Sequence, residues 1–126
     1  MVDANLKILI VDDFATMRKI LKKLLRRFGY SDIHEADDGV TALAKLKKER
    51  FGLIIADWNM PEMSGLDLLK NARADENHKN TPFLMVTAES GKNAIVAAIQ
   101  SGANDYLIKP FNERALEEKL IRLLGS

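Results

Sequence analysis

The sequence predicts an α/β domain in which helices cover both faces of an open, five-stranded parallel sheet. Short apolar segments that suit buried strands alternate along the chain with longer segments whose apolar residues recur at helical spacing. Short loops join five such strand–helix units, which favours parallel strands with right-handed crossovers. Five units are too few for an eight-stranded barrel, so a doubly wound open sheet is expected.

The first half of the chain supplies three of the expected strands and two helices. Residues 7–11 and 52–56 are apolar runs, whereas the strand at 32–36 is weaker because only Ile33 and Ala36 are apolar. The helix expected at 14–28 is followed by Gly29, and its inward stripe would comprise Phe14, Met17, Leu21, Leu24 and Phe28. The helix expected at 39–49 would turn inward Val40, Leu43 and Leu46.

The second half of the chain supplies two more strands and three helices. Ser64 followed by Asp67 matches a capping box at the start of a helix over 64–74. Pro82 precedes an apolar strand at 83–86, and Gly102 closes a helix over 93–101. The last strand is expected at 105–108 and the last helix at 112–124.

The composition fits one independently folding domain. The chain has 126 residues, of which 47% are hydrophobic and 29% charged. Its net charge of +1 argues against nucleic-acid binding driven by bulk charge. The chain has no cysteine, which excludes disulfides and thiolate sites and suits a reducing compartment. With no signal peptide and no long apolar run, we expect a cytoplasmic protein without membrane insertion.

Polar residues follow four of the expected strands at the point where each strand ends. Asp12 and Asp13 follow the first strand, Asp57 the third, Thr87 the fourth and Lys109 the fifth. Ligand sites of open α/β sheets lie at the carboxyl ends of the strands, so these side chains are expected to converge. Carboxylates alone favour Mg²⁺ or Mn²⁺ over zinc or copper. A lysine beside them can bind phosphoryl oxygens as a point charge.

Each of these residues also has a simpler interpretation. Asp12 or Asp13 could merely cap the first helix, since aspartate is a preferred N-cap. Thr87 and Lys109 could be an ordinary strand-end threonine and a surface lysine. Asp57 is different, because the four residues after it, Trp58-Asn59-Met60-Pro61, do not start a helix. The joint pattern, rather than any one residue, indicates a cation site beside a phosphate-sized anion site.

The spacing of these motifs resembles the receiver domain of two-component response regulators over nearly the whole chain. The resemblance rests on Val11-Asp12-Asp13, Asp57 with Met60-Pro61 and Gly65, Thr87-Ala88 and Lys109-Pro110-Phe111. Further matches to the chemotaxis receivers are Asp12-Asp13-Phe14, Asp57-Trp58-Asn59-Met60-Pro61, Met85-Val86-Thr87-Ala88-Glu89, Tyr106 and Leu116-Glu117-Glu118-Lys119-Leu120. The resemblance implies a single receiver domain over 1–126 with no output domain. It also implies a flavodoxin-like (βα)5 fold with strand order 2-1-3-4-5, an order of which chemotaxis receivers are themselves a standard example.

The resemblance implies a role for each site residue. Asp57 would accept a phosphoryl group from the phosphohistidine of a histidine kinase. The Mg²⁺ that this reaction needs would be held by Asp12, Asp13, Asp57 and the backbone carbonyl of Asn59. Lys109 and Thr87 would contact the phosphoryl oxygens, and the residues that tune hydrolysis would be Asn59 and Glu89. The Lys109–Pro110 peptide bond is expected to be cis.

The resemblance also implies how the signal would leave the site. Thr87 would move toward the phosphoryl group and Tyr106 would turn inward, which changes a partner surface containing Lys92, Tyr106 and Lys119. The protein would be a monomeric switch rather than an enzyme, and its phosphorylated form would bind the flagellar motor switch. A phosphatase is a further candidate partner. The alternative is a single-domain phosphorelay shuttle or phosphate sink that does not bind the motor.

Two other classes of protein fit the sequence less well. An aspartate-nucleophile phosphatase needs a second aspartate two residues after the nucleophile, where Asn59 stands. A flavin or nucleotide carrier would need a glycine-rich phosphate loop after the first strand, where Asp12-Asp13-Phe14-Ala15 stands. His34 and His78 show no metal-ligand spacing and are expected on the surface. The basic run within 18–27 is expected to be a solvated helix face.

Overall fold

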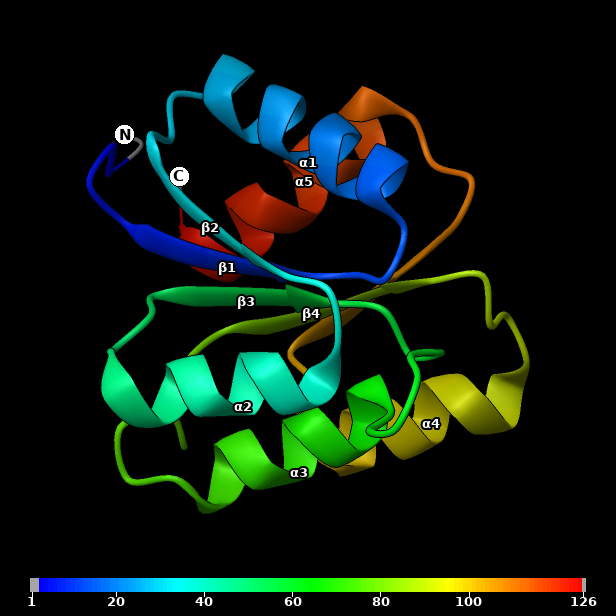
Figure 1. Cartoon of the computed structure of the whole chain (residues 1–126). Coiled ribbons are helices and arrows are strands. Elements are labelled where there is room, and N and C mark those ends of the chain that lie inside the picture. The colour runs from blue at the N-terminus through cyan, green and yellow to red at the C-terminus, as the bar shows by residue number, and fades with distance from the viewer. Residues whose placement is uncertain (1–2, 126) are drawn as a thin grey trace.

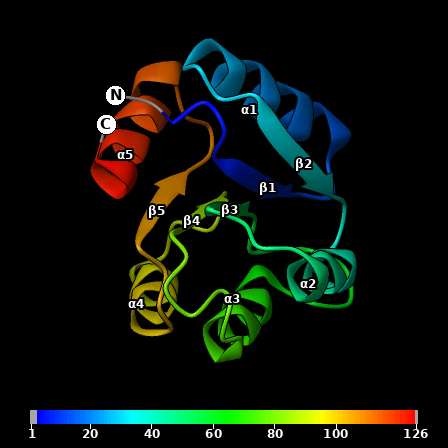
Figure 2. The same cartoon turned by 90° about the vertical axis from the view of Figure 1, so that its left-hand side faces the viewer.

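Five parallel strands form one sheet in the order β2-β1-β3-β4-β5, with helices on both faces (Figures 1 and 2). The computed structural model describes residues 3–125. Its elements are β1 (Lys7–Val11), α1 (Ala15–Arg27), β2 (Asp32–Ala36), α2 (Gly39–Lys48), β3 (Leu53–Ala56), α3 (Gly65–Ala74), β4 (Phe83–Thr87), α4 (Lys92–Gln100), β5 (Asp105–Ile108) and α5 (Glu113–Leu124). The predicted fold class and strand order are confirmed.

Two hydrophobic cores lie on the two faces of the sheet. Figure 2 shows α1 and α5 on one face, with α2, α3 and α4 on the other. Successive side chains of a strand point to opposite faces, so Ile8 and Ile10 pack with the first pair of helices. Leu9 and Val11 pack with the other three helices. The central strands are buried on both faces, which accounts for their unbroken apolar runs.

The inward stripe of α1 differs from the prediction at its first residue. Phe14 is 65% exposed and lies before the helix, with φ −94° and ψ 113°. Because its backbone is extended, the helical period that would have turned Phe14 toward the sheet does not include it. Leu21 and Leu25 are the buried residues of this helix.

The inward stripe of α2 was also predicted wrongly at one position. Ala42 and Leu46 are fully buried, whereas Val40 is 48% exposed. Val40 lies two residues before Ala42, about 200° around the helix from it, so the two cannot face the same core.

At the start of α3 the predicted capping box is present in part, because Ser64 Oγ accepts a hydrogen bond from the Asp67 N–H at 3.1 Å. None of the helices within residues 3–125 is long and apolar enough to cross a membrane.

His78 is buried and not on the surface as predicted. Its ring is 0% exposed, and its Nε2 accepts a hydrogen bond from the Phe51 N–H at 3.2 Å. Nδ1 therefore carries the proton of the neutral ring, and the nearest carboxylate oxygen is Asp75 Oδ1 at 3.7 Å. Burial, with a smaller contribution from Arg50, lowers the pKa of His78, although Asp75 opposes the shift. Nothing in the local sequence marks His78 as buried, because Phe51 covers it from a distant loop.

The buried histidine makes the stability of the protein dependent on pH. The pKa of His78 is lower in the folded protein than in the unfolded chain, so its contribution is complete above the unfolded value near 6.5. This contribution is lost as the pH falls from the unfolded pKa through the lower pKa of the folded protein. Between these two pKa values we expect the free energy of unfolding to fall by about 1.4 kcal/mol per pH unit. Urea unfolding of wild type and His78→Gln between pH 7.5 and 5.5 measures this; equal slopes would contradict it.

Candidate functional site

The carboxyl ends of the strands bring the predicted polar residues to one edge of the sheet. Val11 of β1 pairs with Ala56 of β3, so the residues that follow them, Asp12 and Asp57, are neighbours. The Asp57 N–H donates to the Val11 carbonyl at 3.0 Å and continues the ladder by one step. Thr87 ends β4, and Lys109 follows β5. The predicted convergence is therefore present in the structure.

The three carboxylates form one compact cluster. One oxygen from each of Asp12, Asp13 and Asp57 lies within 4.8 Å of the others. Asp12 and Asp57 are 1% and 6% exposed, whereas Asp13 is exposed. Neither Asp12 nor Asp13 is the N-cap of α1, because that position belongs to Phe14, which makes no side-chain cap. The simpler interpretation of these residues as helix caps is therefore wrong.

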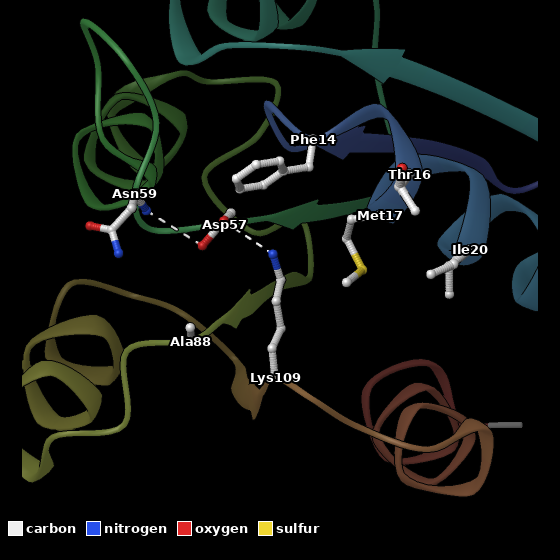
Figure 3. A pocket seen from close by; sticks show the side chains of 8 residues that line it. All are labelled: Phe14, Thr16, Met17, Ile20, Asp57, Asn59, Ala88 and Lys109. Carbon is white, nitrogen blue, oxygen red and sulfur yellow. Dashed lines mark hydrogen bonds and ion pairs between the residues drawn. The ribbon is translucent and has the colours of Figure 1, made fainter.

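Lys109 contacts both buried carboxylates, and Figure 3 shows its side chain pointing toward Asp57. Its Nζ donates to Asp12 Oδ2 at 2.8 Å and to Asp57 Oδ2 at 3.1 Å. Burial alone would lower the pKa of Lys109, but Asp12 and then Asp57 more than offset it, so the pKa is raised above its usual value. The lysine thus stays cationic and compensates charge that burial would otherwise make unfavourable. The Lys109–Pro110 peptide bond is cis, as expected.

The donor set of this cluster fits a hard divalent cation. It offers three carboxylates, and nitrogen or sulfur donors are missing from the cluster within the described residues. The exposed Asp13 leaves a path from solvent, while the buried Asp12 and Asp57 supply donors of fixed position. Oxygen-only sets of this kind suit Mg²⁺ better than zinc or copper. The cluster could therefore hold a metal ion.

A chain of hydrogen bonds runs from the site into the loop between β4 and α4. The buried Thr87 accepts through Oγ1 from the Glu89 N–H at 3.2 Å, and the Tyr106 hydroxyl donates to the Glu89 carbonyl at 2.6 Å. Asn59 Nδ2 donates to Glu89 Oε1 at 3.0 Å. Burial, then Glu89 and then Asp57 raise the pKa of Tyr106. Tyr106 is only 7% exposed, so its side chain points inward in this structure.

The predicted partner surface contains features that the sequence did not reveal. Lys92 is exposed at the start of α4, but Lys119 is ion-paired with Asp105 at 2.8 Å and half-buried. Three exposed apolar side chains lie on the neighbouring elements α4 and β5; they are Val96, Ile99 and Ile108. Ala98 is the buried residue of α4, and the exposed Val96 and Ile99 were not predicted from the sequence.

An apolar groove opens directly beside Asp57. Its volume is about 380 Å³, and its lining residues are Phe14, Thr16, Met17, Ile20, Asp57, Asn59, Ala88 and Lys109 (Figure 3). The α1 side of the groove is largely apolar, and the Asp57 carboxylate lies at its other side. A ligand in this groove would therefore reach Asp57 while much of its own surface packs against α1. The groove could not be predicted from the sequence, because the helical spacing of Phe14 placed it in the core.

The chain matches the response regulator receiver domain family over residues 8–121. It is 56% identical over 119 residues to the chemotaxis protein CheY-3 of Vibrio cholerae, covering 94% of this chain and 92% of that protein. The structure of V. cholerae CheY4 is also similar, with a TM-score of 0.88, 39% identity and coverage of 95% and 99%.

A second similar structure, the receiver domain of a sensor histidine kinase from Pseudomonas aeruginosa, has a magnesium ion coordinated in its active-site cleft. Its TM-score is 0.87 and its sequence identity 31%, and the match covers 98% of this chain and 100% of that chain. The chain belongs to the response regulator receiver family. Within that family, it is a CheY-like chemotaxis response regulator.

Proposed function

We propose that the protein is a stand-alone phosphorylation switch of chemotaxis. Asp57 accepts a phosphoryl group from the phosphohistidine of a histidine kinase, and the phosphorylated form binds a flagellar motor switch protein. The protein acts as a monomer through its single receiver domain and changes only its own phosphorylation state. Both partners would meet it in the cytoplasm, and a phosphatase is a further candidate partner. The observation that carries this proposal is a buried carboxylate, paired with a lysine, at the side of an open groove.

The proposed transfer is an in-line displacement at phosphorus. A carboxylate oxygen of Asp57 forms the new P–O bond while the P–N bond to the donor histidine breaks and its electron pair returns to the imidazole. We propose that Asp12, Asp13, Asp57 and the backbone carbonyl of Asn59 hold Mg²⁺. When bound, the ion offsets negative charge on the transferring group. Lys109, already 3.1 Å from Asp57 Oδ2, would then bind a phosphoryl oxygen as a point charge.

The proposed signal travels through Thr87 and Tyr106. A phosphoryl group on Asp57 adds acceptor oxygens near the buried Thr87 hydroxyl, which now accepts a hydrogen bond from the Glu89 N–H. If Thr87 turns to donate to the phosphoryl group, that bond is lost and the loop carrying Glu89 moves. Tyr106 donates to the Glu89 carbonyl, so its packing beside α4 responds to the same movement. Asn59 and Glu89, hydrogen-bonded at 3.0 Å beside Asp57, would limit the access of water and so tune hydrolysis.

A binding measurement tests the proposal. Fluorescence anisotropy of a labelled peptide from a flagellar motor switch protein is recorded with Mg²⁺, with and without a small acyl-phosphate donor. We expect phosphorylation to tighten binding about tenfold, a typical coupling free energy between two sites. Asp57→Asn is the matched control and should bind equally in both conditions. Phosphorylation without any gain in affinity would favour the relay shuttle or phosphate sink.

A further inference from the structure

Arg18 of α1 lies against the backbone of Asp12 instead of extending into solvent. Its Nη1 donates to the Asp12 carbonyl oxygen at 2.6 Å, and its Nε donates to Glu35 Oε1 at 3.1 Å. The side chain of Arg18 is 18% exposed, whereas that of Arg114 on α5 is 87% exposed. The prediction that the basic run of α1 is a solvated face is therefore wrong at this position.

Glu35 keeps the Arg18 guanidinium in place. It lies on β2, which pairs with β1 in parallel, and Figure 2 shows α1 running alongside β2. Its second oxygen, Oε2, accepts from Lys22 Nζ at 2.8 Å. The Lys22 hydrogen bond lowers the pKa of Glu35 more than partial burial raises it, and Arg18 lowers it further. Glu35 is thus an anionic anchor shared by two cations, of which only Arg18 also reaches Asp12.

All four polar groups of Asp12 have defined partners. The backbone N–H donates to the Ala36 carbonyl at 3.2 Å. The carboxylate oxygens Oδ1 and Oδ2 accept from the Phe14 N–H at 2.9 Å and from Lys109 Nζ at 2.8 Å. Its carbonyl oxygen accepts from Arg18. The hydrogen bond from Arg18 therefore fixes the orientation of the peptide that joins Asp12 to Asp13. At this peptide the chain turns away from β1.

We infer that Arg18, anchored by Glu35, is a positioning residue that holds Asp12 and Asp13 in the arrangement that binds Mg²⁺. The inference rests on the proposed function, because it concerns the same metal and phosphoryl site. Side chains that orient metal ligands typically change metal affinity by ten- to a hundredfold, since a misplaced ligand loses much of its contribution. Among the described residues, the hydrogen bonds of the Arg18 side chain go to the Asp12 carbonyl and to Glu35, so Arg18 acts through Asp12 and not on the reacting atoms.

A pair of matched variants tests the inference. Arg18→Met and Lys22→Met each replace a cation of α1 that contacts Glu35 by an apolar chain of similar length, but only the first loses the contact with Asp12. The Mg²⁺ dissociation constant is measured by titration of Trp58 fluorescence without phosphodonor. We expect Arg18→Met to weaken Mg²⁺ binding about tenfold. Lys22→Met should change it by less than about twofold, as for other partly exposed ion pairs.

The outcomes separate positioning from general stability. Unfolding in EDTA reports any loss of fold stability, and Mg²⁺ titrations are made where circular dichroism shows each variant to be folded. Arg18→Lys, whose ammonium can reach one of the two partners, should fall between wild type and Arg18→Met. Equal Mg²⁺ affinity for Arg18→Met and wild type would overturn the inference. If Arg18→Met does not fold, Glu35→Gln replaces it, and an unchanged Mg²⁺ affinity there has the same meaning. A wild-type protein that binds no Mg²⁺ would instead refute the proposed metal site.

Discussion

Asp57→Asn is expected to abolish phosphorylation. Asparagine keeps the size and shape of the side chain, but its amide oxygen lacks the negative charge that makes the carboxylate a nucleophile. The buried position is retained, and Lys109 keeps its 2.8 Å contact with Asp12, so the variant should still fold. We expect a complete loss of the Trp58 fluorescence response to a small acyl-phosphate donor in the presence of Mg²⁺.

The control for this prediction is Asp37→Asn. Asp37 is exposed just after β2. Asp37→Asn therefore makes the same chemical substitution at a position away from Lys109. It should respond to the donor as wild type does. A persistent response in Asp57→Asn would show that another residue accepts the phosphoryl group, and the site assignment would be wrong.

Gly65→Ala is expected to lower the free energy of unfolding by about 3 kcal/mol, a large value for overpacking. A Cβ at this position would lie 2.0 Å from the Asp57 carbonyl oxygen and 2.8 Å from the Asp57 carbonyl carbon. Both neighbours are backbone atoms, so the start of α3 would have to move away from the end of β3. The Gly65 N–H also donates to the Trp58 carbonyl at 2.8 Å, and that bond would lengthen. Urea unfolding measures the loss, and the rate of phosphorylation should fall because Asp57 moves.

Gly91→Ala is the matched control for Gly65→Ala. Gly91 precedes α4, and a Cβ there would meet no atom within 4 Å. Alanine is a somewhat poorer N-cap than glycine, so a loss below about 1 kcal/mol is expected. Similar losses for the two variants would show that the close approach of α3 to Asp57 does not restrict the site.

The fold could be predicted because its determinants are local. The central strands are buried on both faces, and this burial leaves continuous apolar runs in the sequence. The chain ends each strand at the same edge of a parallel sheet, so the convergence of Asp12, Asp57 and Lys109 follows from topology alone. Helix faces were harder to predict, because one residue of error at a helix start turns Phe14 from a core position to an exposed one.

The parts that could not be predicted depend on contacts between distant segments. His78 is buried because Phe51 covers it, 27 positions away in the chain. Arg18 looks like any other cation of a basic helix until β2 brings Glu35 beside it. The ion pair of Lys119 with Asp105 likewise requires α5 to pack against β5. Such pairings depend on the three-dimensional register and leave no local pattern.

Locating the phosphoryl group is the most direct test of Asp57 as the phosphoacceptor. Wild-type protein is treated with a small acyl-phosphate donor with and without Mg²⁺, its intact mass is measured, and the modified peptide is mapped after borohydride reduction of the acyl phosphate. We expect one phosphoryl group per chain, dependent on Mg²⁺ and placed on Asp57. Modification at another residue, or no modification in the presence of Mg²⁺, would contradict it.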